Sequence, residues 1–234
     1  PSEKVAPLPE DLTECSGMVA LHENAIALVN DGGNDPELFV VDTTGKLLHQ
    51  STIPGVKNED WESLTYADGI LYIGDFGNNR NSRQDLKIYR LDMSRFFEEG
   101  LMVVLEPIRF KYADQKEFPP DGPRLNYDLE AMISMGDSLY LFTKNRTEPF
   151  DGYTHCYSLA KTPGEQVAKR ISSYKTGPGL MESYWISGAT FNQKHHQLVL
   201  TGYDKLWIFS EFEGTDFFRD LRFEVSSKHS FHLN

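Results

Sequence analysis

The sequence predicts an all-β fold, a β-propeller made from one repeated four-strand unit. Short segments rich in β-branched and aromatic residues recur along the whole chain. Helical periodicity is nearly absent, and only MSRFFEEGL (93–101) suits a helical turn. The 18 glycines and 12 prolines are scattered, as turns between many short strands require. Four strands per repeat, the first two joined by a tight turn, are typical of a propeller blade.

The repeated unit appears four times within a single domain, residues 1–234. We place the blades at approximately 14–55, 60–112, 128–176 and 185–227. The expected strands are 16–21, 25–31, 37–42 and 46–53; then 61–69, 70–77, 86–92 and 105–112; then 129–137, 138–145, 154–160 and 168–176; then 185–193, 197–204, 206–212 and 221–227. The second and third units exceed the usual roughly 40–50 residues, which indicates insertions at 79–85 and 113–127. A β-sandwich also has many short strands, but it has no reason to repeat a four-strand unit in register.

Closure of the ring allows two arrangements. The four blades that the sequence predicts form either a four-bladed ring or a five-bladed ring whose last blade is incomplete. Residues 1–13 offer a possible closing strand, since EKVAPLPEDL (3–12) suits the outer edge of a last blade. A propeller with a blade missing would expose two apolar blade faces.

Composition and charge exclude some classes of partner. The formal net charge is −12, so the surface repels phosphate backbones and nucleic acid is a poor candidate. No apolar run approaches the ~20 residues that span a bilayer. Cys15 and Cys156 form no C-x-x-C motif and no disulfide framework, and they can pair only if the fold brings them together; we interpret them as two small buried residues.

Acidic side chains recur where the first strand of a unit starts and the second ends. In a propeller these positions gather at one mouth of the central channel. Carboxylates there are costly unless paired, hydrogen-bonded or bound to a cation. Hard oxygen ligands favour Ca²⁺, and the scarcity of histidine nearby argues against zinc. The candidate metal ligands are Asp60, Glu62, Asp75, Asp128 and Glu130. The alternative is structural, because such carboxylates also accept backbone hydrogen bonds that lock blades together.

Other polar residues at the same mouth are candidates for binding a small polar ligand. They are Asn30, Asp31, Asn78, Asn79, Arg80, Arg83, Lys144, Asn145 and Tyr203. The loop GDFGNNRNSR (74–83) suits an anion-binding nest, with Arg80 and Arg83 as a clamp for a carboxylate or phosphate. A solvated turn with locally paired arginines is the alternative for that loop. Lys144 beside Glu130 fits either an ion pair or a substrate contact.

Motifs for a covalent nucleophile are missing from the sequence. It contains no G-x-S-x-G, no P-loop and no H-E-x-x-H. Ser16 and Ser187 precede glycines, but no histidine is placed to activate either. This argues against serine hydrolase chemistry.

Several segments resemble a known family. NDGGN (30–34), NEDWESL (58–64), LYIGDFGNNRNSR (71–83), LYLFTKN (139–145) and ISGATF (186–191) look like a family of uncharacterised exported bacterial β-propellers, whose members share DWE and GD-x-G-N-N-x-x-R segments. That family is akin to the SdiA-regulated, NHL-like and phytase-like propellers. The resemblance implies a secreted, periplasmic or cell-surface location. Family members usually add one more innermost strand and a following strand ending in N-E, which this sequence lacks.

Three functions are compatible with these residues. The first is a binding module that holds Ca²⁺ or a small polar ligand at the acidic mouth. The second is a calcium-dependent phosphoesterase or esterase, which the phytase-like resemblance implies. The third is a protein-interaction scaffold that uses no metal.

Overall fold

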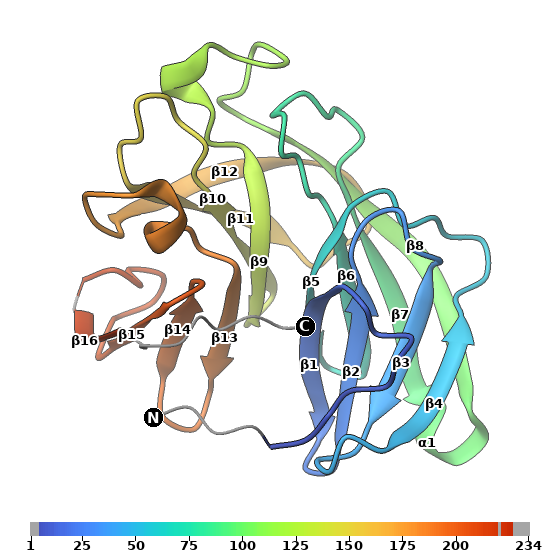
Figure 1. Ribbon diagram of the computed structural model, residues 1–234. Coiled ribbons are helices and arrows are strands. Elements are labelled where there is room, and N and C mark those ends of the chain that lie inside the picture. Colours follow the sequence, from blue (N-terminus) through green and yellow to red (C-terminus); the bar gives the residue numbers. More distant parts are fainter. Residues whose placement is uncertain (1–4, 220, 227–234) are drawn as a thin grey trace.

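The chain folds as an all-β protein, which confirms the all-β part of the predicted fold class. The computed structural model describes residues 5–219 and 221–226, and Figure 1 shows their arrangement. All sixteen strands of this described part overlap a segment that the sequence predicts as a strand. The helical turn predicted within 93–101 is confirmed as α1 (Phe96–Glu99), and the described residues hold two further short 3₁₀ turns, Gly122–Arg124 and Met181–Tyr184. No helix among these residues has the length and apolar character to cross a membrane.

The strands come in four successive groups of four, and the first and last groups form separate sheets. Within each group the strands pair antiparallel in chain order. The first sheet contains β1 (Cys15–His22), β2 (Ala25–Asn30), β3 (Glu37–Val41) and β4 (Leu47–Thr52). The last contains β13 (Gly188–Asn192), β14 (Gln197–Thr201), β15 (Lys205–Ser210) and β16 (Leu221–Ser226).

The second and third groups share one eight-stranded sheet. Their strands are β5 (Trp61–Ala67), β6 (Ile70–Asp75), β7 (Lys87–Arg95) and β8 (Leu101–Tyr112), then β9 (Asp128–Met135), β10 (Ser138–Lys144), β11 (Tyr153–Ala160) and β12 (Gly164–Lys175). The outermost strands β8 and β12 pair in parallel, which joins the two groups at the periphery. The expected insertions 79–85 and 113–127 lie outside regular strands.

Each group packs against its neighbour in the chain through an apolar core of its own. One core lies between the first and second groups, another between the second and third, and another between the third and fourth. The innermost strands follow the same order, since β1 contacts β5, β5 contacts β9 and β9 contacts β13. These strands lie toward the middle of the molecule, as Figure 1 shows. They line a cavity of about 1050 Å³ together with parts of β2 and β14.

The N-terminal segment does not form the predicted closing strand within the described residues. Residues 1–4 lie outside the described part, and residues 5–13 have no strand structure. Instead Leu8 and Leu12 pack on Leu28 and Phe39 of the first sheet, and Leu12 is 3% exposed. The segment therefore covers one apolar face of the first sheet without extending a sheet edge. Both cysteines are free and buried.

Candidate functional site

Three carboxylates meet where β2 ends and β5 begins. Asp31 directly follows β2, Asp60 directly precedes β5, and Glu62 is the second residue of β5. One carboxylate oxygen from each lies within 4.8 Å of the others. We call Asp31, Asp60 and Glu62 the acidic trio. The sequence predicts all three at the mouth, although it assigns Asp31 to ligand binding and not to a metal.

A β-bulge explains why the side chain of Glu62, at the start of β5, lies beside Asp31 and Asp60. Between Trp61 and Ser63 the pairing of β5 with β6 shifts by one residue, so Glu62 is the unpaired extra residue. The same shift occurs at Ser16 of β1, and at Glu130 of β9. A bulge bends the strand and redirects the extra side chain. The innermost strands therefore present Ser16, Glu62 and Glu130 at equivalent positions.

Hydrogen bonds of the Asn58 side chain fix the loop before β5 against the end of β2. The side-chain amide of Asn58 donates to the carbonyls of Asn30 at 3.0 Å and Asp31 at 2.7 Å, and its oxygen accepts from the Trp61 amide at 3.1 Å. The Trp61 indole is fully buried in the core between the first two groups. Burial of a large aromatic side chain contributes about 1.5–3 kcal/mol or more, so this anchor holds the flanking acids Asp60 and Glu62 in place.

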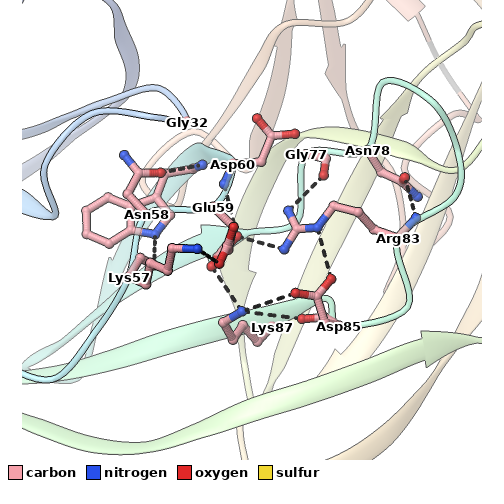
Figure 2. A network of polar contacts seen from close by, with 12 residues as sticks. Gly32, Lys57, Asn58, Glu59, Asp60, Gly77, Asn78, Arg83, Asp85 and Lys87 are labelled. Carbon is pink, nitrogen blue, oxygen red and sulfur yellow. Dashed lines mark hydrogen bonds and ion pairs between the residues drawn. The ribbon is translucent and has the colours of Figure 1, made fainter.

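Two glycines make room for the acidic trio. A Cβ at Gly77 would lie 2.4 Å from Asp60 Oδ2 and 2.6 Å from Glu62 Oε1. A Cβ at Gly32 would lie 2.7 Å from Asp60 Oδ1. Figure 2 shows Asp60 with Gly32 and Gly77 on either side, and its carboxylate points away from the ion pairs of Arg83. Neither glycine is needed here for a left-handed backbone, so the space itself is what they supply.

The trio is electrostatically strained in the absence of a cation. Among the residues that the structure describes, no hydrogen bond or ion pair reaches the carboxylate of Asp60 or Glu62, and Glu62 is only 6% exposed. Burial, followed by the charge of Asp31, raises the pKa of Asp60 to about 6. Burial, followed by the charge of Glu130, raises the pKa of Glu62 well above its usual value. Burial likewise raises the pKa of Asp31.

The other three predicted metal ligands are paired with cations. Both oxygens of Asp75 are engaged, Oδ1 by Arg83 at 3.0 Å and Oδ2 by Lys87 at 3.2 Å (Figure 2 shows this network around Arg83 and Lys87). Asp128 accepts from Arg146 Nε at 2.7 Å and from the backbone amide of Asn78 at 2.7 Å. These contacts match the structural alternative, in which acids lock neighbouring loops together.

Glu130 shares features with both the paired acids and the acidic trio, because it has a cation partner and still has a raised pKa. Its Oε1 accepts from Lys144 Nζ at 2.9 Å, yet burial and the charge of Asp128 still raise its pKa to about 7. Its charge also acts on Glu62, since β5 and β9 are neighbours. The pair Glu130–Lys144 therefore forms the boundary between the acidic trio and the cations of the third group.

Most of the predicted ligand-binding residues make contacts within the protein. The side chain of Asn30 forms hydrogen bonds with the backbone of Asp11 and Glu14. The side chain of Asn78 forms hydrogen bonds with the backbone of Tyr127 and Arg83. The side chain of Asn145 forms hydrogen bonds with Asp151, Tyr153 and Thr147. Arg83 also donates to the Gly77 carbonyl, so it braces the loop 74–83 from within. Asn79 is exposed and bonds Arg146, and Arg80 is exposed.

Two aromatic rings lie beside Lys144 and Arg146: Tyr203, which the sequence predicts as a ligand-binding residue, and Trp185, which it does not. Lys144 Nζ lies 5.0 Å from the Trp185 ring and 5.5 Å from the Tyr203 ring, and the Arg146 guanidinium lies 4.8 Å from Trp185. The two rings meet edge to face at 5.9 Å. We call Lys144, Arg146, Trp185 and Tyr203 the cation–aromatic wall. The sequence signal for Trp185 was its place at the start of the expected strand 185–193, as Trp61 stands at the start of the expected strand 61–69.

Neither of the two serines that precede glycines, Ser16 and Ser187, forms a hydrogen bond with a histidine among the residues that the structure describes. Ser16 Oγ donates to the Trp61 carbonyl at 2.6 Å, and Ser187 Oγ donates to the Thr201 carbonyl at 3.4 Å. Two serine–histidine contacts lie on the outer strands of the described chain: His49 Nε2 is 2.8 Å from Ser51 Oγ on β4, and His155 Nδ1 is 2.8 Å from Ser173 Oγ between β11 and β12. Arg170 can only donate, so His155 Nε2 accepts from it and Nδ1 carries the proton. His155 therefore donates to Ser173 and cannot activate it as a base.

Comparisons with known proteins show no family. No protein-family model matches the chain, and no curated protein matches it. Among solved structures, the chain is similar to the computationally designed Ika4 protein, with 12% identity and a TM-score of 0.39 over 89% of this chain and 98% of that one. It is also similar to a chain of the Mitotic Checkpoint Complex, with 9% identity and a TM-score of 0.45 over 97% of this chain and 55% of that one.

Proposed function

We propose that this protein is an exported β-propeller that binds Ca²⁺ at the mouth of its channel through Asp31, Asp60 and Glu62. The observation that carries the proposal is the meeting of three carboxylates, two of them without a hydrogen-bond donor among the described residues. A side chain as buried as Glu62 that points into this cluster without a partner is a costly arrangement unless a cation occupies it.

The propeller architecture is supported by the repetition of strand groups. Four groups of four antiparallel strands pack in chain order, each pair with its own core, and their innermost strands surround one cavity. β13 packs on β9 but lacks a comparable contact with β1 in the described chain. This weak contact between β13 and β1 favours a five-bladed geometry over a four-bladed one.

The ligand set favours calcium over other metals. All three donors are carboxylates, and Ca²⁺ prefers six to eight hard oxygen ligands. No histidine or cysteine belongs to the described cluster, which argues against zinc. A site of three carboxylates whose remaining positions are open suits the millimolar to submillimolar affinity of extracellular calcium modules. An exported location would supply calcium at that level.

Thermal melts in Ca²⁺ and in EDTA test the proposal. At free Ca²⁺ of 100 times Kd, binding adds about 2.7 kcal/mol, which for a chain of this size raises Tm by about 5–11 °C. The variant Glu62→Gln should lose this increment, whereas Glu165→Gln, an exposed control on β12, should keep it. Equal melting temperatures in millimolar Ca²⁺ and in EDTA would exclude the site.

A further inference from the structure

The mouth has two chemically different sides. The acidic trio comes from the first and second strand groups, and the cation–aromatic wall comes from the third and fourth. The two sides are joined by the loop at 77–79: a Cβ at Gly77 would lie 2.6 Å from Glu62 Oε1, whereas the side chain of Asn79 accepts a hydrogen bond from Arg146 of the wall. A ligand held by a cation in the trio would therefore meet the wall.

The charges of the wall are already balanced within the protein. Lys144 pairs with Glu130 at 2.9 Å, and Arg146 pairs with Asp128 at 2.7 Å, so two cations face two carboxylates. The trio holds three further carboxylates, and a single divalent cation leaves one negative charge in excess. The mouth loaded with calcium, like the whole chain at −12, therefore repels an anion. This favours an uncharged ligand over a phosphate ester or a carboxylate.

The wall nevertheless retains capacity to bind polar oxygens. An ammonium group has three donors, and the described contacts of Lys144 use one of them, to Glu130. The Lys144 side chain is 9% exposed, so its two remaining donors have little access to solvent. Hydroxyl oxygens of an uncharged ligand would satisfy them.

The aromatic residues of the wall suit a ligand with an apolar face. Trp185 is half-buried, and its indole Nε1 donates to the Asn145 carbonyl at 2.5 Å, which fixes the ring by its edge. The Tyr203 ring meets it edge to face. The C–H face of a pyranose is apolar and flat, while its rim carries hydroxyls, so a sugar matches both the rings and the spare donors.

The cation in the trio would have open positions for such hydroxyls. Three carboxylates supply three to six oxygens, depending on whether each binds through one oxygen or two, and Ca²⁺ takes six to eight. A vicinal diol presents two oxygens at a spacing that fits one cation. The rest of the coordination shell would come from water or backbone oxygens.

We propose that the mouth binds a carbohydrate, whose vicinal hydroxyls complete the coordination of the cation while its C–H face packs on Trp185 and Tyr203. This inference rests on the proposed calcium site and names its ligand class. It assigns Trp185 as a binding residue, and it separates this protein from a phosphate-ester hydrolase.

Titration calorimetry with methyl α-mannoside, methyl α-fucoside and methyl β-galactoside tests the inference. At least one glycoside should bind in Ca²⁺ and none in EDTA. Trp185→Ala should weaken that binding by about tenfold or more while the affinity for Ca²⁺ alone stays within about twofold. Phe97→Ala, which removes an exposed aromatic from α1, should change neither. If Trp185→Ala does not fold, Tyr203→Leu serves as the second variant with the same expectation.

The outcomes that would contradict the carbohydrate inference differ from those that would contradict the calcium site. If Ca²⁺ binds but none of the glycosides does, if glycoside binding persists in EDTA, or if inorganic phosphate binds in their place, the carbohydrate inference is wrong and the calcium site stands. If Ca²⁺ alone does not bind, the proposed function itself fails.

Discussion

Asp60→Asn should stabilise the calcium-free protein and abolish its response to calcium. The Asp60 carboxylate has no partner among the described residues, so its ionisation works against the fold. Its pKa rises from 3.8 to about 6. A carboxyl group whose pKa is higher in the folded than in the unfolded state lowers the stability of the folded protein as the pH rises from the unfolded pKa through the folded one. The cost is therefore fully present at pH 7.5 and absent below about pH 4.

The size of the effect follows from that shift. About 2 pKa units correspond to about 3 kcal/mol, and solvent screening of a half-buried side chain reduces this to roughly 1.5 kcal/mol. For a domain of this length that is a Tm increase of about 3–6 °C for the calcium-free variant at pH 7.5. Asparagine has the same shape, so packing against Gly32 and Gly77 is preserved.

Differential scanning calorimetry in EDTA and in Ca²⁺, at pH 5 and pH 7.5, measures both effects. The matched control is Asp137→Asn, an exposed acid in the turn between β9 and β10. It should shift neither the calcium-free Tm nor the calcium response. A lower Tm for calcium-free Asp60→Asn at pH 7.5, or an undiminished calcium response, would refute the reasoning.

Three other substitutions separate the trio from its surroundings. Gly77→Ala places a Cβ against Asp60 and Glu62, so calcium titration should show binding lost, with about 1–3 kcal/mol of destabilisation from overpacking. Asp75→Asn leaves Arg83 and Lys87 without their buried carboxylate; chemical denaturation should show about 3–5 kcal/mol lost, while the calcium response persists. Leu12→Ala removes a side chain that covers the first sheet, and denaturation should show about 2–5 kcal/mol lost with the trio unaffected.

The strands were predictable because their signal is local. Alternation and β-branched residues define each strand within a few positions, and the repeat fixes their order. The parallel pairing of β8 with β12 was not predictable, because it joins strands from different units at the periphery. The proposed closing strand was wrong for residues 5–13, where Leu8 and Leu12 follow the apolar face of the first sheet instead.

The sequence predicted which acidic residues lie at equivalent strand ends, but it did not predict which of them are paired with cations. The repeat places Glu62 and Glu130 equivalently, and their charges do interact across β5 and β9. Which acids are neutralised depends on cations elsewhere in the chain, such as Arg146 for Asp128. Such pairings depend on side-chain reach in three dimensions, so five equal candidates in the sequence became two unpaired acids and three paired ones.

Anomalous diffraction from crystals grown with Ca²⁺, or with Tb³⁺ as its substitute, tests the central claim most directly. The account predicts one strong peak about 2.3–2.6 Å from carboxylate oxygens of Asp31, Asp60 and Glu62. A mouth without a peak at millimolar metal, or a metal bound only at another site, would contradict it.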